Sequence, residues 1–165
     1  MPERRVYITG IGVVTPYGLG VKAYEENLFA GVSGVSLISH FDTTGLPTTF
    51  AAQVPLTNNE LEVHLGEPKA AKTMNRAARF ESTAAAEAVR DSGIELGALD
   101  PYRIGVSMGA GGLGLLDQDY IELSHQVILE TANGADTVGS ERLWDATCRR
   151  INPLTPLKAL PNVTV

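Results

Sequence analysis

The sequence predicts an α/β fold in which helices cover both faces of a sheet. Two dense apolar runs with little polar alternation, RVYITGIGVVT at Arg5–Thr15 and RIGVSM at Arg103–Met108, are typical of strands buried on both faces. The alanine-rich stretch Asn75–Ser92 is typical of a helix that packs closely against its neighbours. Because two strands cannot cover their own edges, we expect the domain to be incomplete, with further strands after Val165.

Several shorter elements precede the alanine-rich stretch. Gly10 and Gly12 interrupt the first apolar run and indicate a bend, or a place where another backbone comes close. Residues Val21–Ala30 predict a short amphipathic helix, because their apolar side chains share one face and the glutamates lie off it. Residues 34–55 are rich in turn formers and are expected to be irregular, except for a short edge strand at Thr48–Val54.

The rest of the chain, from residue 58 onward, is predicted to be mostly helical. The expected helical segments are 58–66, with one or two turns, then 75–92, 115–130 and 141–150. Thr73 or Asn75 is the expected N-cap of the alanine-rich helix, and Gly93 is its expected stop. No internal repeat or low-complexity linker divides the chain.

The composition indicates a folded, acidic chain. Hydrophobic residues make up 44% and charged residues 19%, which allows a buried core. Lys and Arg number 13 against 19 Asp and Glu, and the net charge of -6 argues against general binding to nucleic acid or to an anionic membrane. The single cysteine excludes an intrachain disulfide and favours a reduced, cytoplasmic setting. We expect neither a membrane span nor a secretory signal.

Three motifs invite a chemical interpretation, and each has a structural alternative. Gly10 and Gly12 do not form a dinucleotide fingerprint, because Thr15 stands where the third glycine belongs, so no cofactor is expected. The glycine-rich turn at 109–114 lacks the lysine of a P-loop and is either a tight turn or a backbone left bare for a ligand chain. Cys148 lies late in a short helix, where the helix dipole opposes a thiolate, which favours a structural cysteine. No metal site is expected, because the three histidines lie in separate segments: His40, His64 and His125.

Four basic residues lead into the alanine-rich helix at spacings of three, four and three: Lys69, Lys72, Arg76 and Arg79. This spacing predicts that they lie on roughly one helical face. Such a face is either merely solvated or a docking surface for an acidic partner, which long-range attraction would steer toward it.

The order of several longer blocks is more specific than these motifs. RVYITGIGVVTPYGLG is followed by LFAGVSGV, HFDTTGLPTTFAAQV, MNRAARFESTAAAEAVRDSGI, DPYRIGVSMGAGGLG and PLTPLKALPN. In this order the blocks resemble the N-terminal part of the β-ketoacyl-acyl-carrier-protein synthases, the condensing enzymes of fatty acid and type II polyketide synthesis. The resemblance covers essentially the whole chain.

The resemblance implies a thiolase-like α-β-α-β-α fold. Residues 1–165 would be a partial N-terminal half of it, with cap insertions at about 31–102 and 115–152. The family performs a decarboxylative Claisen condensation of acyl and malonyl groups on acyl carrier protein. Its catalytic cysteine, two histidines and lysine would follow Val165, so the chain alone is expected to be inactive. We therefore expect a complementary C-terminal chain and a dimeric or heteromeric assembly.

The resemblance also implies binding residues. Lys69 and Lys72 match basic positions that meet the acidic carrier protein, and Arg76 joins them as a neighbour without a family match. Ala110 and Gly111 would lie at the acyl tunnel, and Ala110 matches a position at its bottom where some relatives place a larger residue. No catalytic, cofactor or metal-binding residue is implied within the chain. Two alternatives stay open: a non-catalytic subunit comparable to a chain-length factor, and a misread or prematurely ended gene.

Overall fold

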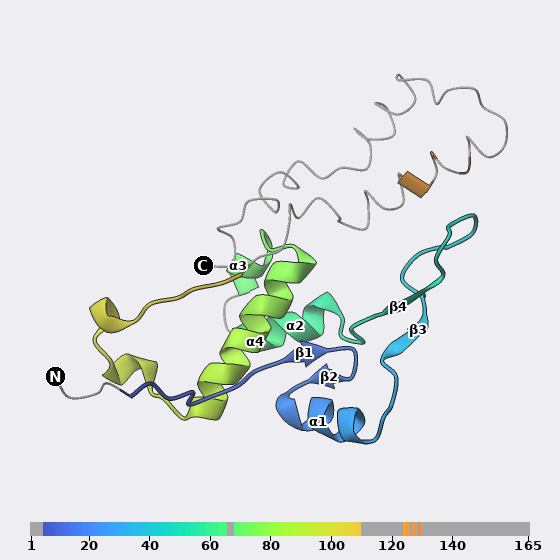
Figure 1. The fold of residues 1–165 in the computed structure, drawn as a ribbon. Coiled ribbons are helices and arrows are strands. Elements are labelled where there is room, and N and C mark those ends of the chain that lie inside the picture. The colour runs from blue at the N-terminus through green and yellow to red at the C-terminus, as the bar shows by residue number, and fades with distance from the viewer. Residues whose placement is uncertain (1–4, 66–67, 110–123, 126, 128, 130–165) are drawn as a thin grey trace.

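The computed structural model describes residues 5–65, 68–109, 124, 125, 127 and 129. Their elements, in order, are β1 (Val14–Thr15), β2 (Gly18–Leu19), α1 (Val21–Phe29), β3 (Val35–Leu37), β4 (Phe50–Ala52), α2 (Asn58–Leu65), α3 (Pro68–Ala71) and α4 (Arg76–Ser92), followed by the 3-10 turns η1 (Leu96–Ala98) and η2 (Pro101–Arg103). Figure 1 shows α2 and α3 beside α4, with β1 and β2 leading into α1. The described part is therefore a mixed fold of helices and short strands.

The predicted helices in this part of the chain are confirmed, and local chemistry explains their ends. The side chain of Asn75 caps α4 by accepting a hydrogen bond from Ala78 N at 2.8 Å. Gly93 ends α4 with a left-handed φ of 64°, and Gly31 follows α1 with a φ of 66°. α2 confirms the helical turns predicted at 58–66.

The strands pair as two separate antiparallel ribbons. β1 pairs with β2 through Val14 and Leu19, and β3 pairs with β4 through Leu37 and Phe50. β4 lies inside the edge strand predicted at Thr48–Val54, whereas β3 falls in a stretch predicted to be irregular. Three residues are too few to show the alternation by which a strand is recognised in a sequence.

The long buried strands predicted at Arg5–Thr15 and Arg103–Met108 are absent from the described part. Only β1 joins a ladder, and the residues before it run as an elongated trace (Figure 1). Val6 is 93% exposed, Ile8 85% and Val106 67%. The prediction of burial on both faces is therefore wrong for these residues, because no described strand pairs with either run apart from the two-residue ladder of β1 with β2.

The glycines of the first apolar run allow its backbone to lie close to α4. A Cβ placed on Gly10 or Gly12 would lie 2.7 Å or 2.5 Å from a backbone nitrogen of α4. Between them, the backbone N–H of Ile11 donates to Asp91 Oδ2 at 2.9 Å. The prediction that these glycines mark a close approach of another backbone is confirmed.

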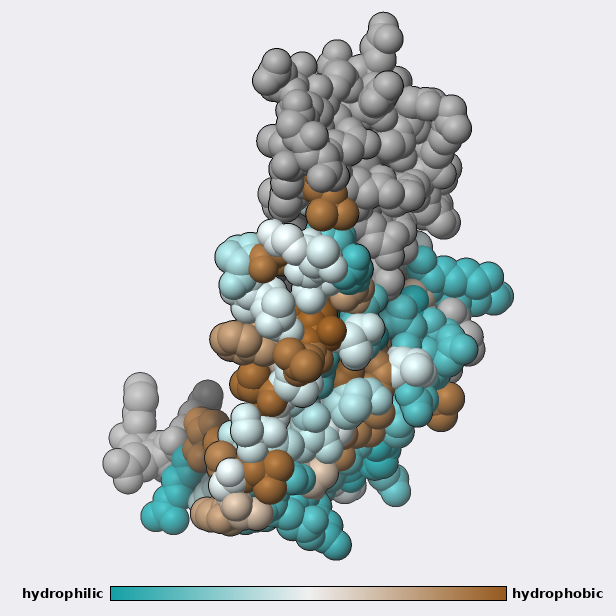
Figure 2. Space-filling model, turned by 90° about the vertical axis from the view of Figure 1, so that its right-hand side faces the viewer, coloured by the Kyte–Doolittle hydropathy of each residue, from teal (hydrophilic) through white to brown (hydrophobic). Residues whose placement is uncertain are grey.

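A small core lies where α2, α3 and α4 meet. Leu61 of α2 and Ala71 of α3 are fully buried, and Ala78 of α4 is 2% exposed. Thr83 Oγ1 donates to Leu61 O at 3.5 Å across the α2–α4 contact. Figure 2 shows brown, apolar surface open among hydrophilic patches on one side of the molecule. Among the helices of the described ranges, none has both the length and the hydropathy to cross a bilayer.

Candidate functional site

The four basic residues lie around the junction of α2, α3 and α4. α3 has four residues and ends in a turn, where Lys72 N donates to Lys69 O at 3.4 Å and Met74 N donates to Ala71 O at 3.2 Å. α4 begins only at Arg76. The prediction that the basic residues share one helical face is therefore wrong, because the chain turns between α3 and α4.

Lys69 and Lys72 are the exposed members of this cluster. Both side chains are open to solvent. In the ranges that the structure describes, the three ion pairs involve other residues. Two ammonium groups on one short turn create a local positive potential in a chain of net charge -6. This turn can attract an acidic protein surface.

Arg76 is engaged by its own chain. Its Nη2 donates to Val54 O at 3.2 Å and to Leu56 O at 2.8 Å, and its Nη1 donates to Asn58 Oδ1 at 2.9 Å. The guanidinium also lies 4.9 Å from the ring centroid of Phe80. Burial, and to a lesser extent the charge of Arg79, lowers the pKa of Arg76 below its ordinary value.

Arg79 lies deeper still. The residue is 8% exposed, and its guanidinium pairs with Glu62 of α2. Sequence reasoning did not single out Glu62. Its charge was visible in the sequence, but spacing along the chain does not show which acid a base on the next helix will meet.

The N-terminus of α2 is fixed by a local pair of hydrogen bonds. Thr57 Oγ1 accepts a hydrogen bond from Glu60 N at 3.2 Å, while Thr57 N donates to Glu60 Oε2 at 2.6 Å. This reciprocal pair is a capping box. Hydrogen bonds from the Thr57 backbone, and next from its hydroxyl, lower the pKa of Glu60 below its ordinary value. The cap fixes where α2 begins and thus where Glu62 meets Arg79 of α4.

The predicted acyl-tunnel residues Ala110 and Gly111 lie outside the described residues, as does Cys148. His125 is described: it is 9% exposed, and its Nε2 lies 2.6 Å from Thr44 O. This contact agrees with a structural histidine. Among the described residues, no group of three or more His, Cys, Asp or Glu side chains is arranged to hold a metal ion.

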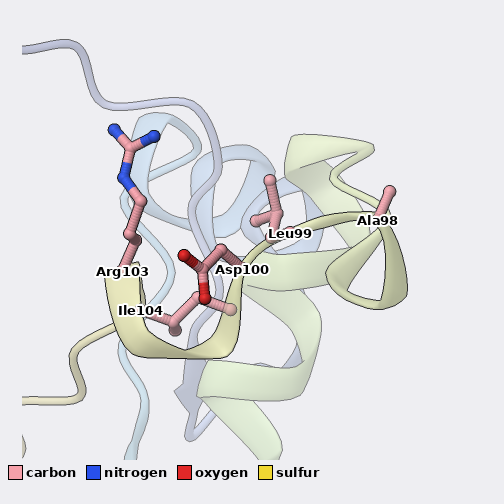
Figure 3. Close-up of a pocket in the computed structure, with 5 residues that line it drawn as sticks. All are labelled: Ala98, Leu99, Asp100, Arg103 and Ile104. Atoms are coloured by element: carbon pink, nitrogen blue, oxygen red, sulfur yellow. The ribbon is translucent and has the colours of Figure 1, made fainter.

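A hollow of about 350 Å³ opens beside the 3-10 turns. Figure 3 shows the five residues that line it: Ala98, Leu99, Asp100, Arg103 and Ile104. All five are exposed, and the Asp100 carboxylate accepts a hydrogen bond from Tyr102 N at 3.0 Å as a local cap. A hollow without a buried polar group gives a ligand little to bind.

The sequence as a whole matches a known family. A model of the β-ketoacyl synthase N-terminal domain matches residues 3–152. The chain therefore belongs to the β-ketoacyl synthase family, and its fold is that of a thiolase-like ketosynthase N-terminal domain. This identification confirms the family and the fold class that the sequence predicted.

Individual relatives include enzymes of both polyketide and fatty acid synthesis. The chain is 38% identical over 125 residues to a putative polyketide β-ketoacyl synthase 1 of Streptomyces cyaneus, covering 74% of this chain and 29% of that protein. It is 37% identical over 130 residues to the 3-oxoacyl-(acyl-carrier-protein) synthase 2 of Vibrio cholerae, covering 79% and 30%. The chain thus spans about 30% of the length of these curated relatives.

A solved structure of a ketosynthase is similar to this chain. The ishigamide ketosynthase/chain length factor superimposes with a TM-score of 0.63 at 28% sequence identity. The match covers 98% of this chain and 35% of that chain. The similarity therefore extends over nearly the whole sequence, but over only part of the larger protein.

Proposed function

We propose that this chain is the N-terminal portion or a subunit of a β-ketoacyl-acyl-carrier-protein synthase of fatty acid or polyketide synthesis, acting in the cytoplasm. The observation that carries the proposal is the family match over residues 3–152. Relatives named as polyketide β-ketoacyl synthase and 3-oxoacyl-(acyl-carrier-protein) synthase, at 38% and 37% identity, support it.

The proposed reaction is a decarboxylative condensation. A cysteine thiolate accepts an acyl group from a carrier thioester and releases the carrier thiol. A malonyl group on a second carrier loses carbon dioxide, and its carbanion attacks the acyl thioester and expels the thiolate. The product is a β-ketoacyl thioester on the second carrier, and the free thiolate is restored.

We assign neither the thiolate nor its histidines to this chain, and we propose that a complementary ketosynthase chain supplies them. The exposed apolar side chains of Val6, Ile8 and Val106 support such a partner. Extended segments with exposed apolar side chains are stabilised when neighbouring strands pair with them and cover those side chains. The assembly would be dimeric or heteromeric.

Co-expression tests this requirement. The chain is produced with a polypeptide that carries the C-terminal remainder of a β-ketoacyl synthase, including its cysteine. We expect acylation of that cysteine and β-ketoacyl product only when both chains are present, as measured by intact-protein mass spectrometry. Acylation and condensation by this chain alone would contradict the proposal.

A second candidate is a non-catalytic subunit comparable to a chain-length factor. The structural similarity to a ketosynthase/chain length factor supports this second candidate. In that case the partner would load acyl groups equally well without this chain, and only the length of the product would change. Ala110 and Gly111, proposed to lie at the acyl tunnel, would then contribute to that length.

We also propose that Lys69, Lys72 and Arg76 form a docking surface for acyl carrier protein. Lys69 and Lys72 supply its exposed charges. Arg76, at the start of α4, is partly buried and donates hydrogen bonds to Val54 O and Leu56 O in the segment before α2. An acidic carrier protein meets such a surface through long-range attraction.

Charge reversal tests the docking surface. The double variant Lys69→Glu/Lys72→Glu is expected to bind acyl carrier protein about ten-fold more weakly at low salt, and the difference should shrink as salt screens the charges. The control is Lys22→Glu on α1, a lysine whose side chain is 89% exposed. Calorimetric titration of the carrier into each variant gives the affinity; equal binding by the double variant and the control would refute docking at this turn.

A further inference from the structure

One buried side chain ties the turn of Lys69 and Lys72 to the helices around it. Arg79 of α4 pairs through Nη1 with Glu62 of α2. Its Nη2 donates to Ala71 O at 2.6 Å, and its Nε donates to Met74 O at 3.4 Å. A single guanidinium therefore joins α2, the end of α3 and the turn before α4.

The acceptors of Arg79 lie on both sides of Lys72. Ala71 immediately precedes this lysine and is fully buried, while Met74 follows two residues later. The turn's own backbone hydrogen bonds each span only three residues, at 3.4 Å and 3.2 Å. Helical segments much shorter than about 12 residues are not stable alone, so the four-residue α3 depends on tertiary contacts for its conformation.

The chemistry of arginine suits this task. Its planar fork can bond a carboxylate and backbone oxygens at the same time, whereas a lysine ammonium is a compact point charge. The pair is partly buried, with side chains 10% and 31% exposed. A buried ion pair contributes little net stability compared with apolar packing, and its best-attested use is to fix one arrangement among several. Here the fixed arrangement is the path of residues 69–74.

We propose that Arg79 is a positioning residue of the carrier docking surface. It holds the turn so that the ammonium groups of Lys69 and Lys72 are presented together. At 8% exposure it acts through the backbone on either side of Lys72 rather than by touching the carrier. This inference rests on the docking role proposed above.

The test replaces Arg79 in the full chain and follows two readouts. Arg79→Lys keeps the charge but loses the fork, and Arg79→Met also removes the charge. The matched control is Arg90→Met on the same helix, whose arginine pairs with Glu87 but has a side chain that is 55% exposed. The readouts are the affinity for purified holo acyl carrier protein and the hydrogen exchange of backbone amides, with circular dichroism checking that each variant is folded.

Both Arg79 variants are expected to bind the carrier roughly three- to ten-fold more weakly. Amide exchange should speed up at residues 69–74 and stay unchanged in the middle of α4. Arg90→Met should alter neither readout. If Arg79→Met fails to fold, Arg79→Lys and Glu62→Gln decide the question, since Glu62→Gln weakens the pair while leaving the arginine in place.

The outcomes separate this inference from the docking proposal. Unchanged exchange at residues 69–74 in folded Arg79→Lys would overturn the positioning role. Faster exchange with wild-type carrier affinity would overturn its link to docking. If the wild-type chain itself does not bind the carrier, the docking proposal fails and with it the link, while the exchange data still show whether Arg79 holds the turn.

Discussion

At the scale of single residues, Gly10 and Gly12 decide how the N-terminal segment packs. Each lies against the backbone of α4, and a Cβ on either would meet main-chain atoms. Backbone atoms cannot rotate away as a flexible side chain can, so the helix or the segment would have to move. The pattern that superficially suggests a nucleotide fingerprint is explained by this contact.

Gly12→Ala is accordingly expected to lower the free energy of unfolding by about 2 kcal/mol, the usual cost of overpacking. The control is Gly97→Ala, where an added Cβ would meet nothing within 4 Å, and this variant should stay within about 0.5 kcal/mol of the wild type. Urea titrations followed by circular dichroism measure both. Equal stability of the two variants would show that the segment does not pack on α4 in solution.

The two arginines at the α2–α3–α4 junction find their hydrogen-bond partners within their own chain. Arg76 and Arg79 are three residues apart and were predicted to share one helical face with the lysines. Instead, their guanidinium groups donate to backbone oxygens and to acceptors on α2. Among the four basic residues, Lys69 and Lys72 are the exposed ones.

At the scale of elements, the capping box at the start of α2 is an interaction that depends on pH. In the folded chain, hydrogen bonds from Thr57 lower the pKa of Glu60 below its ordinary value of 4.5. A carboxylate whose pKa is lower in the folded state stabilises the fold above its unfolded-state pKa. That contribution is lost as the pH falls through the folded-state pKa.

Glu60→Gln should therefore lower the urea midpoint at pH 7, and the gap from the wild type should close as the pH falls below about 4.5. Glu25→Gln, on the exposed surface of α1, is the control and should show no gap at any pH. Urea midpoints at pH 7, 5 and 3 measure the trend. A gap that stays constant with pH would mean that the Glu60 carboxylate does not cap α2.

At the scale of the whole molecule, the described chain buries little apolar surface outside the α2–α3–α4 junction. The segments that lead into β1 and follow η2 expose Val6, Ile8 and Val106. Their composition is that of strands buried within a sheet. These segments are where we expect a complementary chain to bind.

Ile8→Lys and Val106→Lys distinguish folding from assembly. Both side chains are largely exposed, so each variant should keep the unfolding free energy of the separate chain within about 0.5 kcal/mol. Each should weaken co-purification with the C-terminal partner, because a charge buried between strands is costly. Co-purification at the wild-type level would place the partner elsewhere on the chain.

The sequence by itself determined the family, the mixed α/β class and the helices, since these depend on local signals such as the Asn75 cap, the Gly93 stop and the order of the motif blocks. Of the strands, it located β4 within a predicted edge strand but missed β3 and misjudged the two long apolar runs, because pairing depends on which segments become neighbours in space. Only the tertiary structure separated the exposed Lys69 and Lys72 from Arg76 and Arg79, whose guanidinium groups bond to their own chain. Which base finds an acid or a carbonyl oxygen is decided by helices that meet at an angle, and spacing along one chain cannot show that.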